Sequence, residues 1–268
     1  MKHSNIILAE QDEYITTNHY RRKLFPSLYF YFRHLLRIVY YCNRQAVKGI
    51  YDDDKWIYSS LDIMRGLEKT GIKFHITGMN NLKKVDGPVI FISNHMSVLE
   101  TFIFPVIIHP IKRIVYVMKE ELVRFPLFGP VSAARDPILV SRKNPREDLI
   151  AVLNQGSQKI ANGKSIIIFP QRTRSLYLNP SGFNTLGIKL AKRNNVPIIP
   201  IALLTDAWGN GKFIKDFGKI DPSKEVKICF GEPIKIIGNG SEEHQKVIEF
   251  IKNKFIEWNR NDLIKEQL

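Results

Sequence analysis

Short, continuous runs of apolar residues alternate with amphipathic stretches along most of the chain. Helical spacing of apolar positions predicts helices over residues 98–104, 146–161, 183–193 and 242–259. The apolar runs predict strands over residues 72–77, 88–93, 113–118, 138–141, 164–169, 196–203 and 225–230. Runs without polar positions are typical of strands that are covered on both faces. Strands separated by helices therefore predict an α/β fold with a mixed, mostly parallel central sheet flanked by helices.

The region before the first predicted strand has a different pattern. Ser59 or Ser60 is predicted to cap a helix that ends at Gly71. Neither an internal repeat nor a low-complexity linker divides the residues that follow. We therefore predict two regions, an N-terminal amphipathic helical segment over residues 1–55 and one α/β domain over residues 56–268.

Composition excludes several classes of protein. Of the 268 residues, 44% are apolar and 25% are charged, which argues against a disordered chain. Cys42 and Cys229 lie far apart, which argues against a disulfide scaffold and favours a reducing compartment. No apolar stretch is long enough to predict a transmembrane helix, and the N-terminus does not resemble a secretory signal. The net charge of +14 indicates an anionic partner, which is nucleic acid, an acidic membrane surface or a phosphorylated substrate.

The positive charge is concentrated near the N-terminus. No acidic residue lies between Tyr14 and Tyr51, where seven basic residues are interleaved with aromatic ones. Helical spacing places Leu24, Leu28 and Tyr31 on one apolar stripe. A basic helix of this kind is typical of an element that lies in a membrane interface, with its basic side chains toward anionic headgroups. A core helix with a solvated basic edge fits the same pattern. Nucleic-acid binding ranks third, because no nucleic-acid-binding motif follows.

His95 is the first candidate catalytic residue. It follows the predicted strand 88–93, and α/β folds place reactive groups at the carboxyl ends of strands. Glu100 comes five residues later, a spacing that puts two side chains on different faces of a straight helix. If His95 lies in the turn before the helix, Glu100 reaches its ring, fixes the tautomer and makes the imidazole a general base. Alternatively, Ser97 and Glu100 form a capping box and His95 is a hydrogen-bonded turn residue.

A second candidate segment follows the predicted strand 164–169 and contains Gln171, Arg172, Thr173 and Arg174. Two guanidinium groups on either side of a threonine suit a phosphate, because guanidinium and phosphate pair through two parallel hydrogen bonds. Arg142 follows another predicted strand in the same way. A basic surface loop is the alternative interpretation. Metal-binding motifs such as H-E-x-x-H are absent from the sequence, so we predict no metal site.

Taken in order, four segments resemble signatures of the glycerolipid (lysophosphatidic acid) acyltransferase family. Residues 94–100, N-H-M-S-V-L-E, are similar to the family's N-H-x-S-x-x-D signature. Gly129 with Arg142 resembles the second block, and residues 169–175 resemble F-P-E-G-T-R-S. Residues 196–201 resemble the fourth block, V-P-I/V-I/V-P-V. The resemblance extends over roughly residues 72–230, and four motifs in this order are fairly specific.

The resemblance implies acyl transfer from acyl-CoA or acyl-carrier protein to the free hydroxyl of a lysophospholipid such as 1-acylglycerol-3-phosphate, without a metal, a cofactor or an acyl-enzyme. It implies that His95 is the general base and that Glu100 orients it. Backbone N–H groups at the start of the following helix are the expected oxyanion donors. The implied substrate-binding residues are Asn94, Ser97, Arg142, Gln171, Arg172, Thr173 and Arg174, with Arg142, Thr173 and Arg174 on the acceptor's phosphate.

The expected partners are membrane lipids, the lysophospholipid acceptor and the acyl donor, with no nucleic acid. The expected location is the cytoplasmic face of a membrane, as a peripheral protein. Three residues depart from the family pattern: Glu100 replaces Asp, Gln171 replaces Glu, and Arg172 replaces Gly. They predict a divergent branch with an altered acceptor site. The alternative functions are a thioester or lipid hydrolase and a non-catalytic protein that binds membrane surfaces.

Overall fold

The structure is a computed structural model, and it describes residues 11–18, 20–21, 23–171, 173–211 and 215–265. The described strands form one eight-stranded sheet in the order β1-β2-β8-β7-β3-β6-β4-β5. The pairs from β7 through β3, β6 and β4 to β5 are parallel, as is β2–β8, whereas β1–β2 and β7–β8 are antiparallel. The predicted mixed, mostly parallel sheet is confirmed. The strands are β1 (Tyr14–Ile15), β2 (Phe74–Thr77), β3 (Ile90–Ser93), β4 (Ile114–Lys119), β5 (Ile138–Val140), β6 (Ser165–Ile168), β7 (Ile198–Leu204) and β8 (Val226–Phe230).

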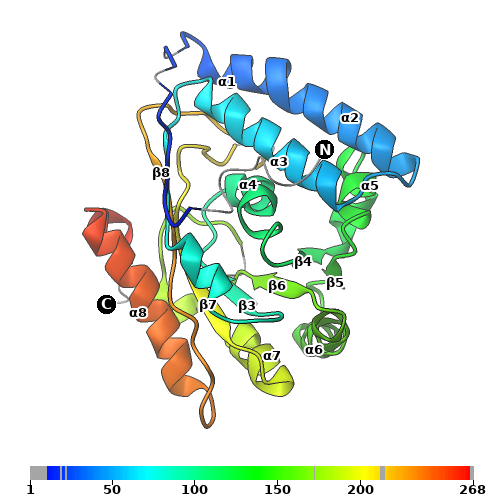
Figure 1. The fold of residues 1–268 in the computed structure, drawn as a ribbon, viewed down its shortest axis with the longest axis vertical. Coiled ribbons are helices and arrows are strands. Elements are labelled where there is room, and N and C mark those ends of the chain that lie inside the picture. Colours follow the sequence, from blue (N-terminus) through cyan, green and yellow to red (C-terminus); the bar gives the residue numbers. More distant parts are fainter. Residues whose placement is uncertain (1–10, 19, 22, 172, 212–214, 266–268) are drawn as a thin grey trace.

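Helices cover both faces of this sheet (Figure 1). The first face carries α1 to α4, and the second carries α6, α7 and α8. The helices are α1 (Pro26–Phe30), a π-helical turn (Tyr31–Leu35), α2 (Leu36–Val47), α3 (Asp53–Glu68), α4 (Leu99–Ile108), α5 (Phe128–Ala133), α6 (Pro145–Ala161), α7 (Leu186–Asn194) and α8 (Ser241–Glu257). The short 3-10 turns are Met79–Lys83, Glu120–Arg124, Pro180–Gly182 and Asn261–Leu263.

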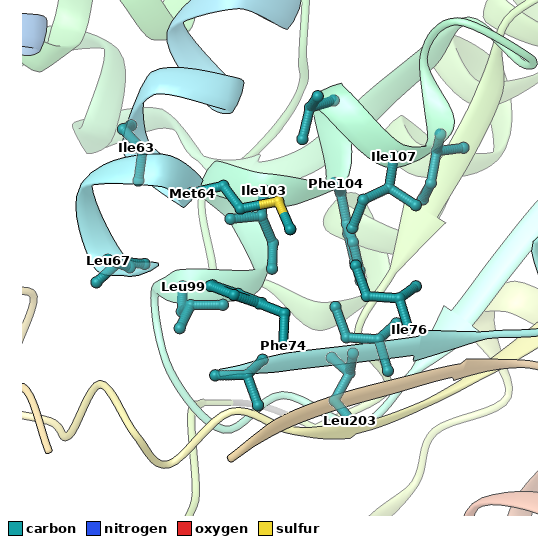
Figure 2. Packing of buried hydrophobic residues seen from close by; sticks show 14 of the residues in the cluster. Ile63, Met64, Leu67, Phe74, Ile76, Leu99, Ile103, Phe104, Ile107 and Leu203 are labelled. Atoms are coloured by element: carbon teal, nitrogen blue, oxygen red, sulfur yellow. The ribbon is translucent and has the colours of Figure 1, made fainter. Parts of the chain in front are cut away.

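The central strand β3 contributes alternate side chains to two hydrophobic cores. Phe91 packs in the core under α3 and α4, whereas Ile90 and Ile92 pack in the core under α6, α7 and α8. Figure 2 shows the first core, in which side chains of α3 and α4 meet Phe74 on β2 and Leu203 on β7. Burial of each large apolar side chain stabilises the fold by about 1.5–3 kcal/mol. Covered faces explain why the central strands have no polar alternation.

One predicted helix start is wrong. Helix α3 begins at Asp53, capped by Asp52, whose Oδ1 accepts a hydrogen bond of 2.9 Å from the backbone N–H of Lys55. The hydroxyl of Ser60, one of the two predicted caps, serves helix α4 instead. It donates to the carbonyl of Phe102 and accepts from the N–H of Val106. The hydroxyl thus lies between the Phe102 carbonyl and the Val106 N–H, which pair directly in a regular helix. Helix α4 continues to Ile108, past the predicted end at residue 104.

The predicted boundary between residues 55 and 56 falls within α3. Phe30 and Leu35 upstream of it are buried in the first core, and the hydroxyl of Tyr31 donates to the carbonyl of Gly218. Other side chains of this segment are exposed, among them Leu24 and Phe32. The division into two domains therefore stays a prediction. Within the described residues, no helix combines the length and the apolar character that crossing a bilayer requires.

Candidate active site

The turn between β3 and α4 holds His95 at the carboxyl edge of the sheet. Strand β3 lies between β7 and β6, so the turn projects from the middle of this edge. The segment after β6 packs against the turn. The side-chain Oε1 of Gln171 accepts a hydrogen bond of 2.6 Å from the N–H of His95, and the N–H of Ser175 donates to the carbonyl of His95 at 2.9 Å. Two of the segments singled out in the sequence therefore meet at one place.

The structure brings His95 and Glu100 together. The imidazole Nδ1 lies 2.8 Å from the carboxylate Oε1, and the Glu100 side chain is fully buried. The ring also stacks on Phe169, with centroids 4.0 Å apart. A carboxylate at Nδ1 favours the tautomer with the proton on that nitrogen, which leaves Nε2 to accept a proton. The predicted placement of His95 in the turn is therefore present, while the catalytic role of the pair stays a prediction.

Five hydrogen bonds hold the Glu100 carboxylate. Besides His95, Oε1 accepts from the backbone N–H groups of Met96 and Ser97 at 2.8 and 3.0 Å. Oε2 accepts from the hydroxyls of Ser97 and Thr205 at 2.9 and 2.8 Å. Burial by itself raises the pKa of the Glu100 carboxyl, but His95 and the Ser97 N–H group outweigh burial and hold that pKa below its usual value. Glu100 thus pairs with His95 and also accepts from the Ser97 N–H, but the capping box is incomplete, because the Ser97 hydroxyl accepts from the N–H of Leu99 and α4 has Val98 at its N-cap.

The Glu100 carboxylate engages two backbone N–H groups of the turn that precedes α4. The N–H groups of Met96 and Ser97 already donate to Glu100. They point back into the protein, so this structure does not present them to a substrate. Met96 and Ser97 precede α4, which begins at Leu99, so the oxyanion donors expected at the start of that helix stay a prediction.

Asn94 and Ser97, two of the predicted substrate-binding residues, lie inside the protein, and their contact with a substrate stays a prediction. Both are 1% exposed. The Asn94 amide donates to the carbonyl of Leu203 and accepts from its N–H, both at 2.9 Å. The Ser97 hydroxyl donates to Glu100 and accepts from the N–H of Leu99. Their polar atoms are therefore engaged within the protein, and they fix the turn against β7 and α4.

A cavity of about 860 Å³ opens beside His95. The predicted phosphate-binding residues Arg142, Thr173 and Arg174, together with Gln171, line it. Arg172 lies outside the described residues. The other side of the cavity is apolar, since α2, α3, α4 and α5 all contribute to its wall. Apolar residues of this wall include Ile38, Val39, Ile63, Phe102, Phe128 and Val131.

The basic side of the cavity is arranged by two aspartates. Asp148 accepts hydrogen bonds from the backbone N–H groups of Ser141 and Arg142, and so holds Arg142 at a positive φ of 58°. Asp216 forms an ion pair with the guanidinium of Arg174. The ammonium of the neighbouring Lys215 donates to the hydroxyl of Thr173 at 3.2 Å.

Thr205, Asp148 and Asp216 are residues of the site that were not predicted from the sequence. Thr205 follows β7, the neighbour of β3, so a search of all strand ends along one sheet edge would find it. Asp216 lies in an irregular segment far from the recognised motifs, and no sequence signal marks it. No group of three or more His, Cys, Asp or Glu side chains within the described part of the chain is suited to hold a metal ion.

Comparison with known proteins agrees with these motifs. The family model described as Acyltransferase matches residues 73–204. A 1-acyl-sn-glycerol-3-phosphate acyltransferase of Pseudomonas aeruginosa is 31% identical over 132 residues, 49% of each chain. One of Borreliella burgdorferi is 30% identical over 146 residues, 54% of this chain and 56% of the other. The chain thus spans about half the length of the curated relatives it matches.

A solved structure shares the fold. The crystal structure of the 1-acyl-sn-glycerophosphate acyltransferase PlsC from Thermotoga maritima matches with a TM-score of 0.64 and 20% sequence identity, over 87% of this chain and 95% of the other. The matched residues 73–204 hold the His95 turn, Arg142 and the segment after β6. Over these residues the chain matches the family model described as Acyltransferase and is similar to 1-acyl-sn-glycerol-3-phosphate acyltransferases.

Proposed function

We propose that this protein moves a fatty acyl group from an acyl thioester, carried by CoA or acyl-carrier protein, to the free hydroxyl of 1-acylglycerol-3-phosphate or a related lysophospholipid. One observation carries the proposal. The imidazole of His95 lies 2.8 Å from a fully buried carboxylate, beside a cavity with one basic and one apolar side. A base, a place for an anionic headgroup and a place for alkyl chains are the three things that this reaction needs.

The first step is proton transfer to His95. With Glu100 at Nδ1, the Nε2 atom takes the proton of the acceptor hydroxyl as its oxygen attacks the thioester carbonyl carbon. The ring becomes an imidazolium, which the ionised Glu100 stabilises without itself taking the proton. The low pKa of Glu100 supports that division of roles.

The second step breaks the carbon–sulfur bond. The tetrahedral intermediate collapses, the new ester is released, and the leaving thiolate receives the proton from Nε2 of His95. The imidazole returns to its neutral form, so one residue serves as base and then as acid. Protons and charges balance without an acyl-enzyme and without a metal.

The exposed side of the N-terminal segment supports action at a membrane. Leu24, Phe32 and Val47 are 86%, 69% and 69% exposed, and basic residues lie among them in the sequence. Apolar side chains with neighbouring Lys and Arg suit the interface of an anionic bilayer. We place the protein on this basis at the cytoplasmic face of a membrane, as a peripheral protein, where a lysophospholipid is available.

The experiment that tests the activity compares wild type with His95→Ala. Each protein is incubated with labelled acyl-CoA and a panel of lysophospholipids, and the lipid products are separated. The substitution is expected to lower the transfer rate by roughly 10²–10⁴-fold. Circular dichroism and vesicle binding should be unchanged, since the ring is not part of the hydrophobic core. Full activity in His95→Ala would contradict the mechanism.

The same assay separates the alternatives. Labelled free fatty acid that forms without an acceptor would indicate a hydrolase. The absence of turnover with any thioester, together with retained vesicle binding, would indicate a non-catalytic surface-binding protein. A parallel reaction with acyl-carrier protein in place of CoA determines which of the two thioesters the protein accepts as acyl donor.

Membrane docking has its own test. Arg33 and Arg37 lie in the π-helical turn and at the start of α2, in the acid-free basic stretch. Changing both to Glu should weaken co-sedimentation with anionic vesicles, since each basic residue near such a surface contributes about 1 kcal/mol. A matched control with neutral vesicles should show little difference. Unchanged binding to anionic vesicles would remove this segment from the proposal.

A further inference from the structure

An acidic side chain occupies the place where the acceptor's phosphate is expected. Arg174, one of the predicted phosphate ligands, forms an ion pair with Asp216. The guanidinium side chain is 17% exposed and the carboxylate side chain 47% exposed, so the pair lies at the opening of the cavity. An anionic headgroup that binds Arg174 therefore competes with a carboxylate that is already there.

Hydrogen bonds to the carbonyls of Asp216 and Gly218 fix the backbone near Asp216, so its carboxylate is held close to Arg174. The indole N–H of the fully buried Trp208 donates to the Asp216 carbonyl at 3.0 Å. Two residues later, the carbonyl of Gly218 accepts from the hydroxyl of Tyr31 at 2.5 Å. A Cβ atom at position 218 would lie 1.6 Å from the carbonyl oxygen of Gly209, so only glycine fits there.

The charges around the cavity single out this carboxylate. Basic side chains lining it include Lys119, Lys189 and Lys215, besides the arginines. Among the described residues that line the cavity, the carboxylates are Asp148 and Asp216. Asp148 is occupied by the backbone N–H groups after β5. Asp216 is therefore the carboxylate that bears directly on an incoming anion.

We propose that Asp216 is the resident counter-ion of the acceptor site, which holds Arg174 in place in the empty enzyme and is displaced by the anionic headgroup of the acceptor. The inference rests on the proposed function and adds a residue that sets acceptor affinity. A phosphate monoester carries up to two negative charges and binds guanidinium through two hydrogen bonds, so it replaces a single carboxylate. After displacement the half-exposed carboxylate turns to water.

The cost of breaking the ion pair is subtracted from the acceptor's binding. The ion pair breaks when the acceptor binds, before the chemical step. This free-energy cost is therefore the same in the bound ground state and in the transition state, so it changes KM and leaves kcat unchanged. Neutralising Asp216 should therefore strengthen acceptor binding. From the usual strength of partly buried ion pairs, we expect the affinity for the acceptor to rise by about 3- to 10-fold.

The test is a steady-state comparison of wild type and Asp216→Asn with acyl-CoA and 1-acylglycerol-3-phosphate. Asparagine keeps the shape of the side chain and removes its charge. The KM for the acceptor is expected to fall by about 3- to 10-fold with kcat unchanged. Asp262→Asn is the control, because it removes one negative charge from an ion pair with Arg260, outside the residues that line the cavity.

A binding measurement makes the inference independent of turnover. Glycerol 3-phosphate is titrated against each protein, and the protection from thermal unfolding is recorded. The concentration for half-maximal protection should be lower for Asp216→Asn than for wild type and Asp262→Asn by the same factor as KM. Wild type without transfer activity would contradict the proposed function, whereas this titration would still report on Asp216.

Three results would overturn the inference. If Asp216→Asn leaves both KM and glycerol 3-phosphate protection at the wild-type values, the ion pair does not compete with the acceptor. If it raises the KM for the phosphomonoester, Asp216 positions Arg174 for binding. A rise in KM restricted to lysophosphatidylethanolamine would instead assign Asp216 to an amine-bearing headgroup, against the role of displaced counter-ion.

Discussion

The two sides of the His95 cavity differ in how their charged groups are held: one carboxylate is fully buried and the other is half exposed. On the side of the turn, every hydrogen bond to the Glu100 carboxylate comes from a group within the protein, and the carboxylate is fully buried. On the basic side, Arg174 is held by a half-exposed carboxylate. The base is thus arranged before any substrate arrives, whereas the acceptor site must exchange one anion for another. Preorganisation at the first place favours kcat, and exchange at the second sets KM.

The largest effect on the side of the turn is expected from Glu100→Gln. The amide keeps the volume but loses the charge that stabilises the imidazolium, so kcat should fall by roughly 10²–10⁴-fold. KM for the acceptor should change little, because Glu100 does not reach the basic side. Steady-state kinetics measures both, and circular dichroism checks the fold. A main effect on KM would show that the two sides are not separate.

Arg174→Lys probes the opposite side. Lysine keeps the positive charge but loses the planar, two-bond geometry, so KM for the acceptor should rise by about 10-fold with kcat nearly unchanged. The measurement is the same acceptor titration. The matched comparison is Arg193→Lys on α7, whose guanidinium donates to the side chain of Asn154 on α6. An unchanged KM in Arg174→Lys would mean that Arg174 acts only through its positive charge, and an equal rise in both variants would mean that the effect is not specific to Arg174.

Thr205→Val tests one hydrogen bond of the buried Glu100 network. The substitution removes one of the hydroxyls that donate to Oε2 of Glu100 and keeps the shape of the side chain. Leaving a buried acceptor short of one partner costs about 1–3 kcal/mol, so the free energy of unfolding should fall by that amount. Urea unfolding measures it. Thr205→Ser keeps the hydroxyl but loses a buried methyl group, so it should be destabilised less than Thr205→Val; if it unfolds as easily as Thr205→Val, the hydrogen bond is not the cause.

The pH dependence of stability offers the smallest effect. Because the folded-state pKa of Glu100 is below that of an ordinary carboxyl, unfolded chains bind the proton first. Its contribution to the free energy of unfolding is thus full above the ordinary carboxyl pKa of about 4.3 and is lost as the pH falls through the lower folded value. The difference in melting temperature between wild type and Glu100→Gln should shrink over that acidic window. A difference that is constant with pH would exclude this titration.

Much of this architecture could be predicted, because it follows from local pattern. The apolar runs located the central strands, and the spacing of His95 and Glu100 required a turn that is present. What could not be predicted depends on contacts far apart in the chain. Ser60 resembled a helix cap but inserts into α4, and Asn94 pairs with Leu203, 109 positions away. Asp216 meets Arg174 only because the fold brings an irregular segment across the cavity.

The amide of Asn94 extends the hydrogen-bond ladder of β3 and β7 by one step beyond the last backbone pair, Ser93 and Ile201. The turn that holds His95 is therefore hydrogen-bonded as part of the central sheet. Local opening of the turn requires breaking that ladder, so the amide hydrogen of Leu203 should exchange with deuterium only when the whole domain unfolds. The position of the imidazole is therefore fixed by the central sheet, and this loop is expected to be as resistant to local unfolding as the strands beside it.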